Sequence, residues 1–420
     1  MFKNLKLIFS KKNKDIRKRI LFTLFGLLVF ALGTTIPVPG TEGALSSLGL
    51  WELYNAIGGG ALKRFSIFAL GVMPYISASI ITGILQMDIV PYFTELKESG
   101  EQGRQKINQI NRYLGIAIAF VQGFAMAFTF VKGASTLEYM KISLILTGGT
   151  ALLLWLGDQM TQKGIGNGIS LIIMAGIINT VPKMFIDSFD SLVTSRTGSL
   201  FIGIVSFILF ILLYLVIIIG IVYEECSERR IPIQYSNRTA SSYGQKQNYI
   251  PFKLNSAGVM PVIFASVFLS IPSFIAGILG DSSKFSVFVS KYIDYSSVTG
   301  FILYIVLIFI FGFFYTNMQI NPKELAKNLN KSGGYIPGIR PGGETEKYIK
   351  KILNRITLIG SVFIAVIAGL PIVFSSFINT GLPASARIGG TGLLIVVGVA
   401  IETYRQLESS LINRNYKGVR

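Results

Sequence analysis

The most regular feature of the chain is a series of long apolar runs separated by polar or basic segments. Such runs, uncharged at their centres and close to the roughly 20 residues that cross a bilayer as a helix, predict membrane spans. Ten are placed, at residues 20–36, 67–87, 113–131, 142–157, 168–182, 200–222, 257–279, 300–320, 356–375 and 388–404. The pattern predicts an all-α polytopic membrane protein with basic segments at both ends, residues 1–19 and 405–420.

Basic residues are distributed unevenly between the two sides that these spans define. With residues 1–19 placed in the cytosol, the cytosolic segments carry 30 of the 39 Lys and Arg residues. An excess of Lys and Arg in short loops marks the cytoplasmic side of a membrane protein. The sequence therefore predicts that both termini lie in the cytosol, as an even number of spans requires.

Composition narrows the chemistry that such a protein could perform. The chain has no histidine and a single cysteine, Cys226, so zinc, haem and iron–sulfur sites and histidine-based triads are not expected. The predicted spans are almost free of charge at their centres, whereas ion-coupled transporters usually keep ionisable residues there. We expect neither catalytic residues nor a cofactor or metal site, and no proton relay.

Two of the predicted cytosolic loops, residues 223–256 and 321–355, are long, basic and rich in glycine and proline. Pro and Gly at such spacings form defined turns, and the arginines of interest in these loops are Arg229, Arg230 and Arg340. The loops could carry positive-inside charge and nothing else. Alternatively, since the chain has a net charge of +18, they could bind an acidic partner such as RNA or anionic lipid.

Residues 43–66 are partly apolar but contain no run long enough to cross a bilayer, and they include Gly58, Gly59 and Gly60. Two interpretations are open. The segment could be an interfacial helix on the outer surface. It could instead be non-spanning backbone that is buried in the protein or lines a cavity, and the three glycines would then give it a hinge.

Six short segments carry a family resemblance when they are taken together. In chain order they are residues 36–40 (IPVPG), 65–80 (FSIFALGVMPYISASI), 164–170 (GIGNGIS), 257–261 (AGVMP), 337–342 (PGIRPG) and 389–397 (GGTGLLIVV). The chain resembles the SecY family, the channel subunits of the bacterial protein translocon. The resemblance implies a clamshell of two inverted five-helix halves, residues 20–182 and 200–404. It also implies a re-entrant plug at about 43–66 and a lateral gate between the helices at 67–87 and 257–279.

The same resemblance implies a ring of apolar side chains that narrows the pore. The matching positions are Val72, Ile76, Ile169, Ile173, Ile263 and Ile395. Two pairs within this set are spaced i, i+4, so each pair faces one way on its helix. An apolar constriction can exclude ions because it offers nothing that replaces their hydration shell, while flexible aliphatic side chains can yield around an extended polypeptide.

The resemblance further implies a bacterial cytoplasmic membrane and a set of partners. These are SecE-like and SecG-like small membrane subunits, the SecA motor ATPase, the ribosome, signal sequences and nascent secretory chains, and membrane lipids. Arg229, Arg230 and Arg340 would then contact the motor or the ribosome. The alternatives are a secondary transporter of a small solute, which would need a polar site inside the bundle, and a structural membrane scaffold for ribosomes.

Overall fold

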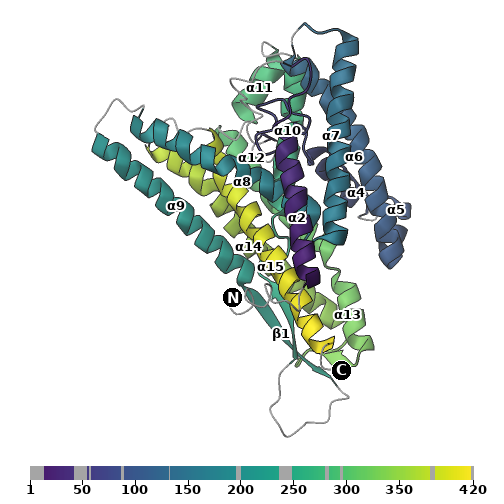
Figure 1. The fold of residues 1–420 in the computed structure, drawn as a ribbon. Coiled ribbons are helices and arrows are strands. Elements are labelled where there is room, and N and C mark those ends of the chain that lie inside the picture. The colour runs from purple at the N-terminus through teal and green to yellow at the C-terminus, as the bar shows by residue number, and fades with distance from the viewer. Residues whose placement is uncertain are drawn as a thin grey trace.

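The computed structural model describes residues 14–41, 54–55, 58–86, 89–131, 133–194, 200–235, 248–279, 283–293, 297–378 and 384–417. Their regular structure is almost entirely helical (Figure 1). The first half contains α2 (Lys14–Gly33), α4 (Met73–Leu85), α5 (Pro91–Glu98), α6 (Gly100–Phe130), α7 (Thr136–Lys163) and α8 (Gly168–Phe189), which continues as the π-helix η3 (Asp190–Thr194). The second half contains α9 (Leu200–Cys226), α10 (Met260–Leu279), α11 (Lys284–Tyr292), α12 (Val298–Gln319), α13 (Pro322–Lys331), α14 (Gly343–Ile378) and α15 (Ala384–Lys417).

Several of these helices have the length and apolar character of membrane spans. Six segments of the described chain meet both criteria, namely Gly100–Phe130, Thr136–Lys163, Gly168–Thr194, Leu200–Cys226, Val298–Lys331 and Gly343–Phe374. α4 and the stretch Met260–Ala276 of α10 are shorter apolar helices. α9 leaves Phe201, Val216 and Ile219 more than half exposed, as suits a helix surrounded by lipid rather than water. The prediction of an all-helical, multi-pass membrane protein is confirmed.

The helix predicted at 67–87 begins later, at Met73, and this boundary was wrong. Residues 67–72 form turns instead, with left-handed backbone at Gly71 (φ +56°). A Cβ on Gly149 of α7 would lie 1.9 Å from the carbonyl oxygen of Ile67, so α7 approaches this turn more closely than a side chain would allow. The hydroxyl of Thr150 also donates to the carbonyl of Gly71 over 3.2 Å. In the apolar stretch before Met73, contacts with α7 therefore take the place of helical backbone hydrogen bonds.

Other helices run beyond their predicted ends. α6 starts at Gly100 rather than 113, α14 starts at Gly343 rather than 356, and α15 continues to Lys417 rather than ending at 404. A hydropathy pattern follows only the apolar part of a helix, so polar turns outside the bilayer escape it. The first turns of α6 are fixed by α5, because a Cβ on Gly103 would lie 1.7 Å from the carbonyl oxygen of Leu96.

The two long loops, 223–256 and 321–355, meet in one small sheet that the sequence did not reveal. Its strands are β1 (Glu228–Tyr235), β2 (Asn248–Lys253) and β3 (Gly334–Tyr335), in the order β2-β1-β3 with antiparallel pairing. α13 and the first turns of α14 cover it with a separate apolar cluster of nine buried residues: Ile231, Ile233, Phe252, Ala326, Leu329, Ile336, Ile349, Leu353 and Ile356. This core makes the two loops one folded unit, at the lower end of the molecule in Figure 1.

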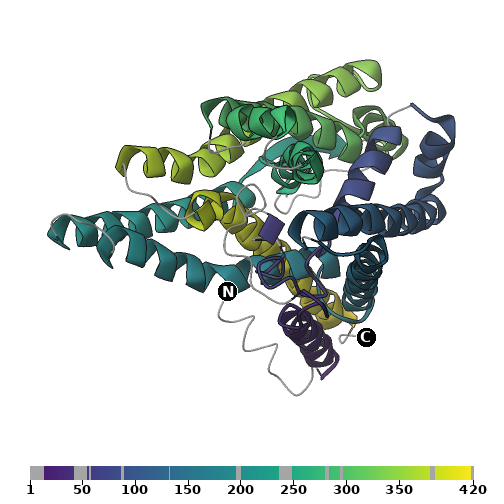
Figure 2. The same ribbon diagram turned by 90° about the horizontal axis from the view of Figure 1, so that it is seen from above.

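The two halves of the chain contact each other through a few helices. α8 packs against α15, and α10 packs against both α4 and α6. Seen from above, the blue helices of the first half lie on the right of the view, next to the green helices of the second half along its upper edge (Figure 2).

Candidate functional site

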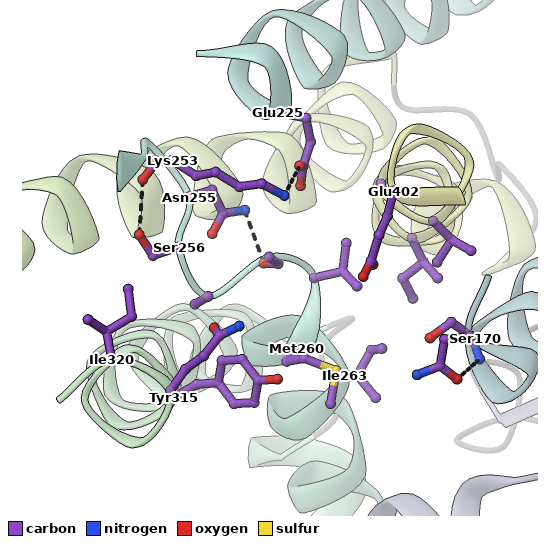
Figure 3. Close-up of a pocket in the computed structure, with 18 of the residues that line it drawn as sticks. Ser170, Glu225, Lys253, Asn255, Ser256, Met260, Ile263, Tyr315, Ile320 and Glu402 are labelled. Carbon is purple, nitrogen blue, oxygen red and sulfur yellow. Dashed lines mark hydrogen bonds and ion pairs between the residues drawn. The ribbon is translucent and has the colours of Figure 1, made fainter. Parts of the chain in front are cut away.

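A cavity of about 620 Å³ lies where the two halves meet. Its walls come from α4 and α8 of the first half and from α9, α10, α12, α13 and α15 of the second half. β2 and residues 255–259, in the connection from β2 to α10, complete the wall. Figure 3 shows side chains from these elements converging on it. The cavity therefore joins the folded unit formed by the two long loops to the interior of the helix bundle.

Aliphatic side chains of four helices form one part of the cavity wall. Five of the six positions implied for the pore ring line it, and they are Ile76 on α4, Ile169 and Ile173 on α8, Ile263 on α10 and Ile395 on α15. The sixth, Val72, is buried directly before α4 and is not part of the lining. The structure thus brings together five of the ring positions, drawn from sequence positions more than 300 residues apart.

The local geometry at the start of α8 fixes where its two isoleucines lie. The side-chain oxygen of Asn167 accepts hydrogen bonds from the backbone N–H groups of Ile169 (3.1 Å) and Ser170 (3.4 Å) and so caps the helix. A Cβ on Gly168 would lie 1.9 Å from the carbonyl oxygen of Gly157 on α7. Only glycine fits this crossing, and it holds the first turn of α8 against α7.

Polar and charged side chains line the rest of the cavity. The carboxylate of Glu225, at the end of α9, lies 3.9 Å from the ammonium nitrogen of Lys253. Arg405 is not part of the lining, but its guanidinium donates to the backbone carbonyl of Glu225 over 2.9 Å. The side chain of Asn255 donates to the carbonyl of Gly258 over 3.0 Å and thereby shapes the turn that leads into α10.

Glu402 on α15 also lines the cavity. Sequence analysis did not single out this residue or the polar residues around Glu225 as parts of a site. For Glu402 a signal was available, because it follows Ile395 by seven residues and therefore shares its helix face. For the polar residues around Glu225 the sequence offers no such signal, since they are brought together only by tertiary contacts.

Two of the three glycines expected to form a hinge, Gly59 and Gly60, lie next to α8. Gly59 and Gly60 have left-handed backbones, with φ of +74° and +80°. The side chain of Asn179 on α8 donates to the carbonyl of Gly59 over 2.9 Å, and Gly58 donates to the carbonyl of Tyr54 over 3.0 Å. Most of the segment predicted as a plug, residues 43–53 and 56–57, lies outside the described residues.

Tyr54, just before these glycines, contacts both halves of the molecule. Its hydroxyl donates to the carbonyl of Leu70 over 3.0 Å. Its ring packs edge-on against Phe274 of α10, with centroids 5.6 Å apart. Most of the described part of residues 43–66 is buried inside the protein, which favours that interpretation over an interfacial helix on the outer surface.

The three arginines of the loops are all exposed. Arg229 and Arg230 are neighbours on β1, and the guanidinium of Arg230 lies 4.8 Å from the centroid of the Tyr249 ring on β2. Arg340 lies between Gly338 and Gly342, both with positive φ, in the turn before α14. The pairing of β1 with β3 brings the two loops into one structure, so they present their basic residues from a common support.

The described residues contain no group of three or more His, Cys, Asp or Glu side chains that could hold a metal ion. The site is instead a water-accessible cavity with an aliphatic part, a polar part and a basic folded unit beside it. This arrangement can admit and contact a chain-like molecule, and nothing in it resembles a constellation of nucleophile, base and oxyanion donors.

Comparison with known proteins places these features in a family. A family model described as SecY matches residues 66–404. A relative in Staphylococcus aureus (strain NCTC 8325 / PS 47), named protein translocase subunit SecY, is 46% identical over 423 residues, covering 97% of both chains. A relative of the same name in Bacillus subtilis (strain 168) is 46% identical over 418 residues, covering 96% of both.

Solved structures share the fold at lower sequence similarity. A structure described as that of a protein conducting channel aligns with a TM-score of 0.66 and 19% identity, covering 94% of this chain and 92% of the other. Sec61 in a canine ribosome–channel complex from the endoplasmic reticulum aligns with a TM-score of 0.63, also with 19% identity and the same coverage.

Proposed function

The chain belongs to the SecY family and forms the channel of a protein translocase in a cell membrane, and we propose that the cavity between its halves is the cytosolic part of the polypeptide path. The observation that carries this proposal is the composition of the cavity wall. Side chains from both halves line one cavity, and isoleucines of α4, α8, α10 and α15 form part of its wall. A path between two halves can widen when the halves move apart.

The aliphatic ring is the gate of this path. Val72, Ile76, Ile169, Ile173, Ile263 and Ile395 form a constriction that an extended chain can pass and that hydrated ions cannot. Five of them share the cavity wall, and Val72 supports them from the buried turn before α4. Because each contributes only aliphatic carbon, no polar group at the constriction can replace an ion's hydration shell.

The topology that follows is ten spans with both termini in the cytosol. α2, α4, α6, α7, α8, α9, α10, α12, α14 and α15 cross the membrane, five in each inverted half. α2 and α15 carry basic and polar turns that lower their hydropathy, and the excess of Lys and Arg on one side supports the orientation. The folded loop unit then faces the cytosol.

The plug and the lateral gate complete the channel. The segment around Gly58, Gly59 and Gly60 closes the path on the outer side, supported by the contacts of Tyr54 with both halves. The gate to lipid lies between α4 and α10, which contact each other directly across the two halves. An apolar segment of the translocating chain leaves sideways there.

The basic loop unit is the docking surface for the partner that drives transport. Arg229, Arg230 and Arg340 contact a SecA-like motor or the ribosome, whose RNA phosphates suit guanidinium groups. The canine Sec61 relative is described in a ribosome–channel complex, which supports the ribosome as one partner. SecE-like and SecG-like subunits complete the complex, signal sequences and nascent secretory chains are its substrates, and the channel itself performs no catalysis.

The names of the relatives favour this function over a secondary transporter of a small solute. The test is reconstitution into proteoliposomes with the cognate SecE-like subunit, the motor ATPase and ATP. A secretory precursor should become protected from external protease, and protection should disappear without ATP. An absence of protection with a folded complex and an active motor would count against motor-driven export.

A further inference from the structure

Carboxylates outnumber cations in the cavity lining, although Arg405, which lies beside Glu225, brings a further positive charge to the same wall. The chain has a net charge of +18, yet the lining contains two carboxylates, Glu225 and Glu402, and one ammonium group, Lys253. Glu225 is buried and its charge is matched by Lys253 at 3.9 Å. Glu402 is exposed and has no ion pair within the described chain. Its carboxylate is therefore available to pair with a cationic group that enters the cavity.

The position of Glu402 places it directly before the aliphatic ring. Ile395, Val399 and Glu402 follow each other at helical spacing on the face of α15 that lines the cavity. Seven residues along an α-helix correspond to about 10 Å, so the carboxylate lies about two turns from the ring position on the same helix. α15 continues to Lys417, so Glu402 is not simply a residue that solvates a helix end.

The carboxylate of Glu402 points into the cavity. Figure 3 shows its side chain extending from α15 towards the region between Met260 and Ser170, while Lys253 is directed towards Glu225. Tyr315 of α12 lies within electrostatic range of it. Glu225 is also within that range, but its charge is offset by Lys253 and Arg405, so Glu402 is the carboxylate left to attract a cation.

We propose that Glu402 binds the basic residues that flank the apolar segment of an entering polypeptide, and so decides which flank stays in the cytosol. This inference rests on the proposed channel function and deepens it. An apolar segment beyond the ring can leave through the gate, while a Lys or Arg about 10 Å behind it can pair with the carboxylate. If that cation moved further into the channel, its ion pair with Glu402 would break and its charge would enter an apolar constriction.

The test compares two secretory precursors in proteoliposomes that hold the complete translocase. One precursor has two lysines before its apolar segment, and the other has glutamines at those positions. We expect Glu402→Gln to lower the ratio of their translocation rates, basic over neutral, about fivefold, the size expected of one partly screened charge pair. The control Glu101→Gln removes an exposed carboxylate on α6 that lies outside the cavity, and it should leave the ratio unchanged.

A charge reversal gives the second readout. Glu402→Lys should make a precursor with two glutamates at the same positions the preferred substrate, because the sign of the contact is inverted. An unchanged ratio in Glu402→Gln, or no gain for the acidic precursor in Glu402→Lys, overturns the inference while leaving the channel function intact. If the wild-type complex protects none of the precursors, the proposed function itself fails and the inference fails with it.

Discussion

Replacing Gly59 by alanine should open the resting channel to ions, because both the backbone conformation at this residue and its close contact with α8 require glycine. Its backbone has a φ of +74°, which L-residues rarely adopt. A Cβ there would lie 3.0 Å from the Cα of Gly176 on α8, a contact between two backbones that no side-chain rotation can relieve. Any shift also threatens the 2.9 Å hydrogen bond from Asn179 to the carbonyl of Gly59.

The neighbouring Gly60 separates these effects. Its φ is +80°, but the nearest atom to a Cβ is the methyl carbon of Thr180 at 3.9 Å, an ordinary contact. Gly60→Ala therefore adds only left-handed backbone strain, about 1–2 kcal/mol. This strain would shift the equilibrium between the closed and the displaced positions of the glycine segment about tenfold towards the displaced one. Gly59→Ala adds the contact with α8 and the loss of a hydrogen bond worth about 1 kcal/mol, which raises the shift to about seventyfold.

The measurement is the ion conductance of the reconstituted complex in planar bilayers without precursor or motor. The expected order of open probability is Gly59→Ala, then Gly60→Ala, then wild type. Gly40→Ala is the control for strain elsewhere, since Gly40 has a φ of +83° and free space around a Cβ. Equal conductance of Gly59→Ala and Gly60→Ala would show that contact with α8 does not hold the segment closed.

Two further predictions concern the ring and the docking surface. Ile263→Ser should raise the resting ion leak, because a hydroxyl on the buried ring position lets water wet the constriction. Ile271→Ser, exposed on the same helix, should not, and equal leaks would argue against the ring. Arg340→Glu should reduce motor-driven translocation severalfold with an unchanged thermal midpoint, because Arg340 is exposed. Wild-type transport rates in that variant would remove its role.

The apolar runs predicted the helices well because a bilayer imposes a simple requirement on length and polarity. The same reasoning explains where prediction failed. At residues 67–72 the sequence is as apolar as a span, but the backbone follows α7 at Gly149 instead of forming a helix. Such a turn depends on a contact across the bundle, which a pattern along the chain does not contain. The ordered sheet was missed for a related reason, since its strands β1 and β3 lie about 100 residues apart.

Only part of the candidate site could be predicted from the sequence. The ring positions came from motifs that resemble those of SecY proteins, and spacing alone would have left Ile169 and Ile173 as ordinary core residues. The polar part of the cavity has no motif at all. Glu225 and Lys253 are brought together by the end of α9 and the end of β2, and their meeting depends on the folded loop unit.

The last prediction concerns how docking reaches the gate. β2 pairs with β1, which carries Arg229 and Arg230, and the chain after β2 enters α10 through residues 254–259. A Cβ on Gly360 of α14 would lie 3.0 Å from the carbonyl oxygen of Leu254, so this connection is held tightly against α14. The buried side chain of Asn255 then fixes its turn through the 3.0 Å hydrogen bond to Gly258.

A displacement of the sheet therefore acts on α10 through a short, firmly packed connection. Asn255→Ala removes a hydrogen bond worth about 1 kcal/mol and loosens that connection. It should lower motor-driven translocation severalfold while the affinity for the motor, measured by binding to proteoliposomes, stays at the wild-type value. The matched variant Ser256→Ala lies in the same turn and removes a bond to the carbonyl of Lys253, but it keeps the side-chain hydrogen bond from Asn255 to Gly258. A similar loss in both variants would show that this hydrogen bond is not what carries docking to the gate.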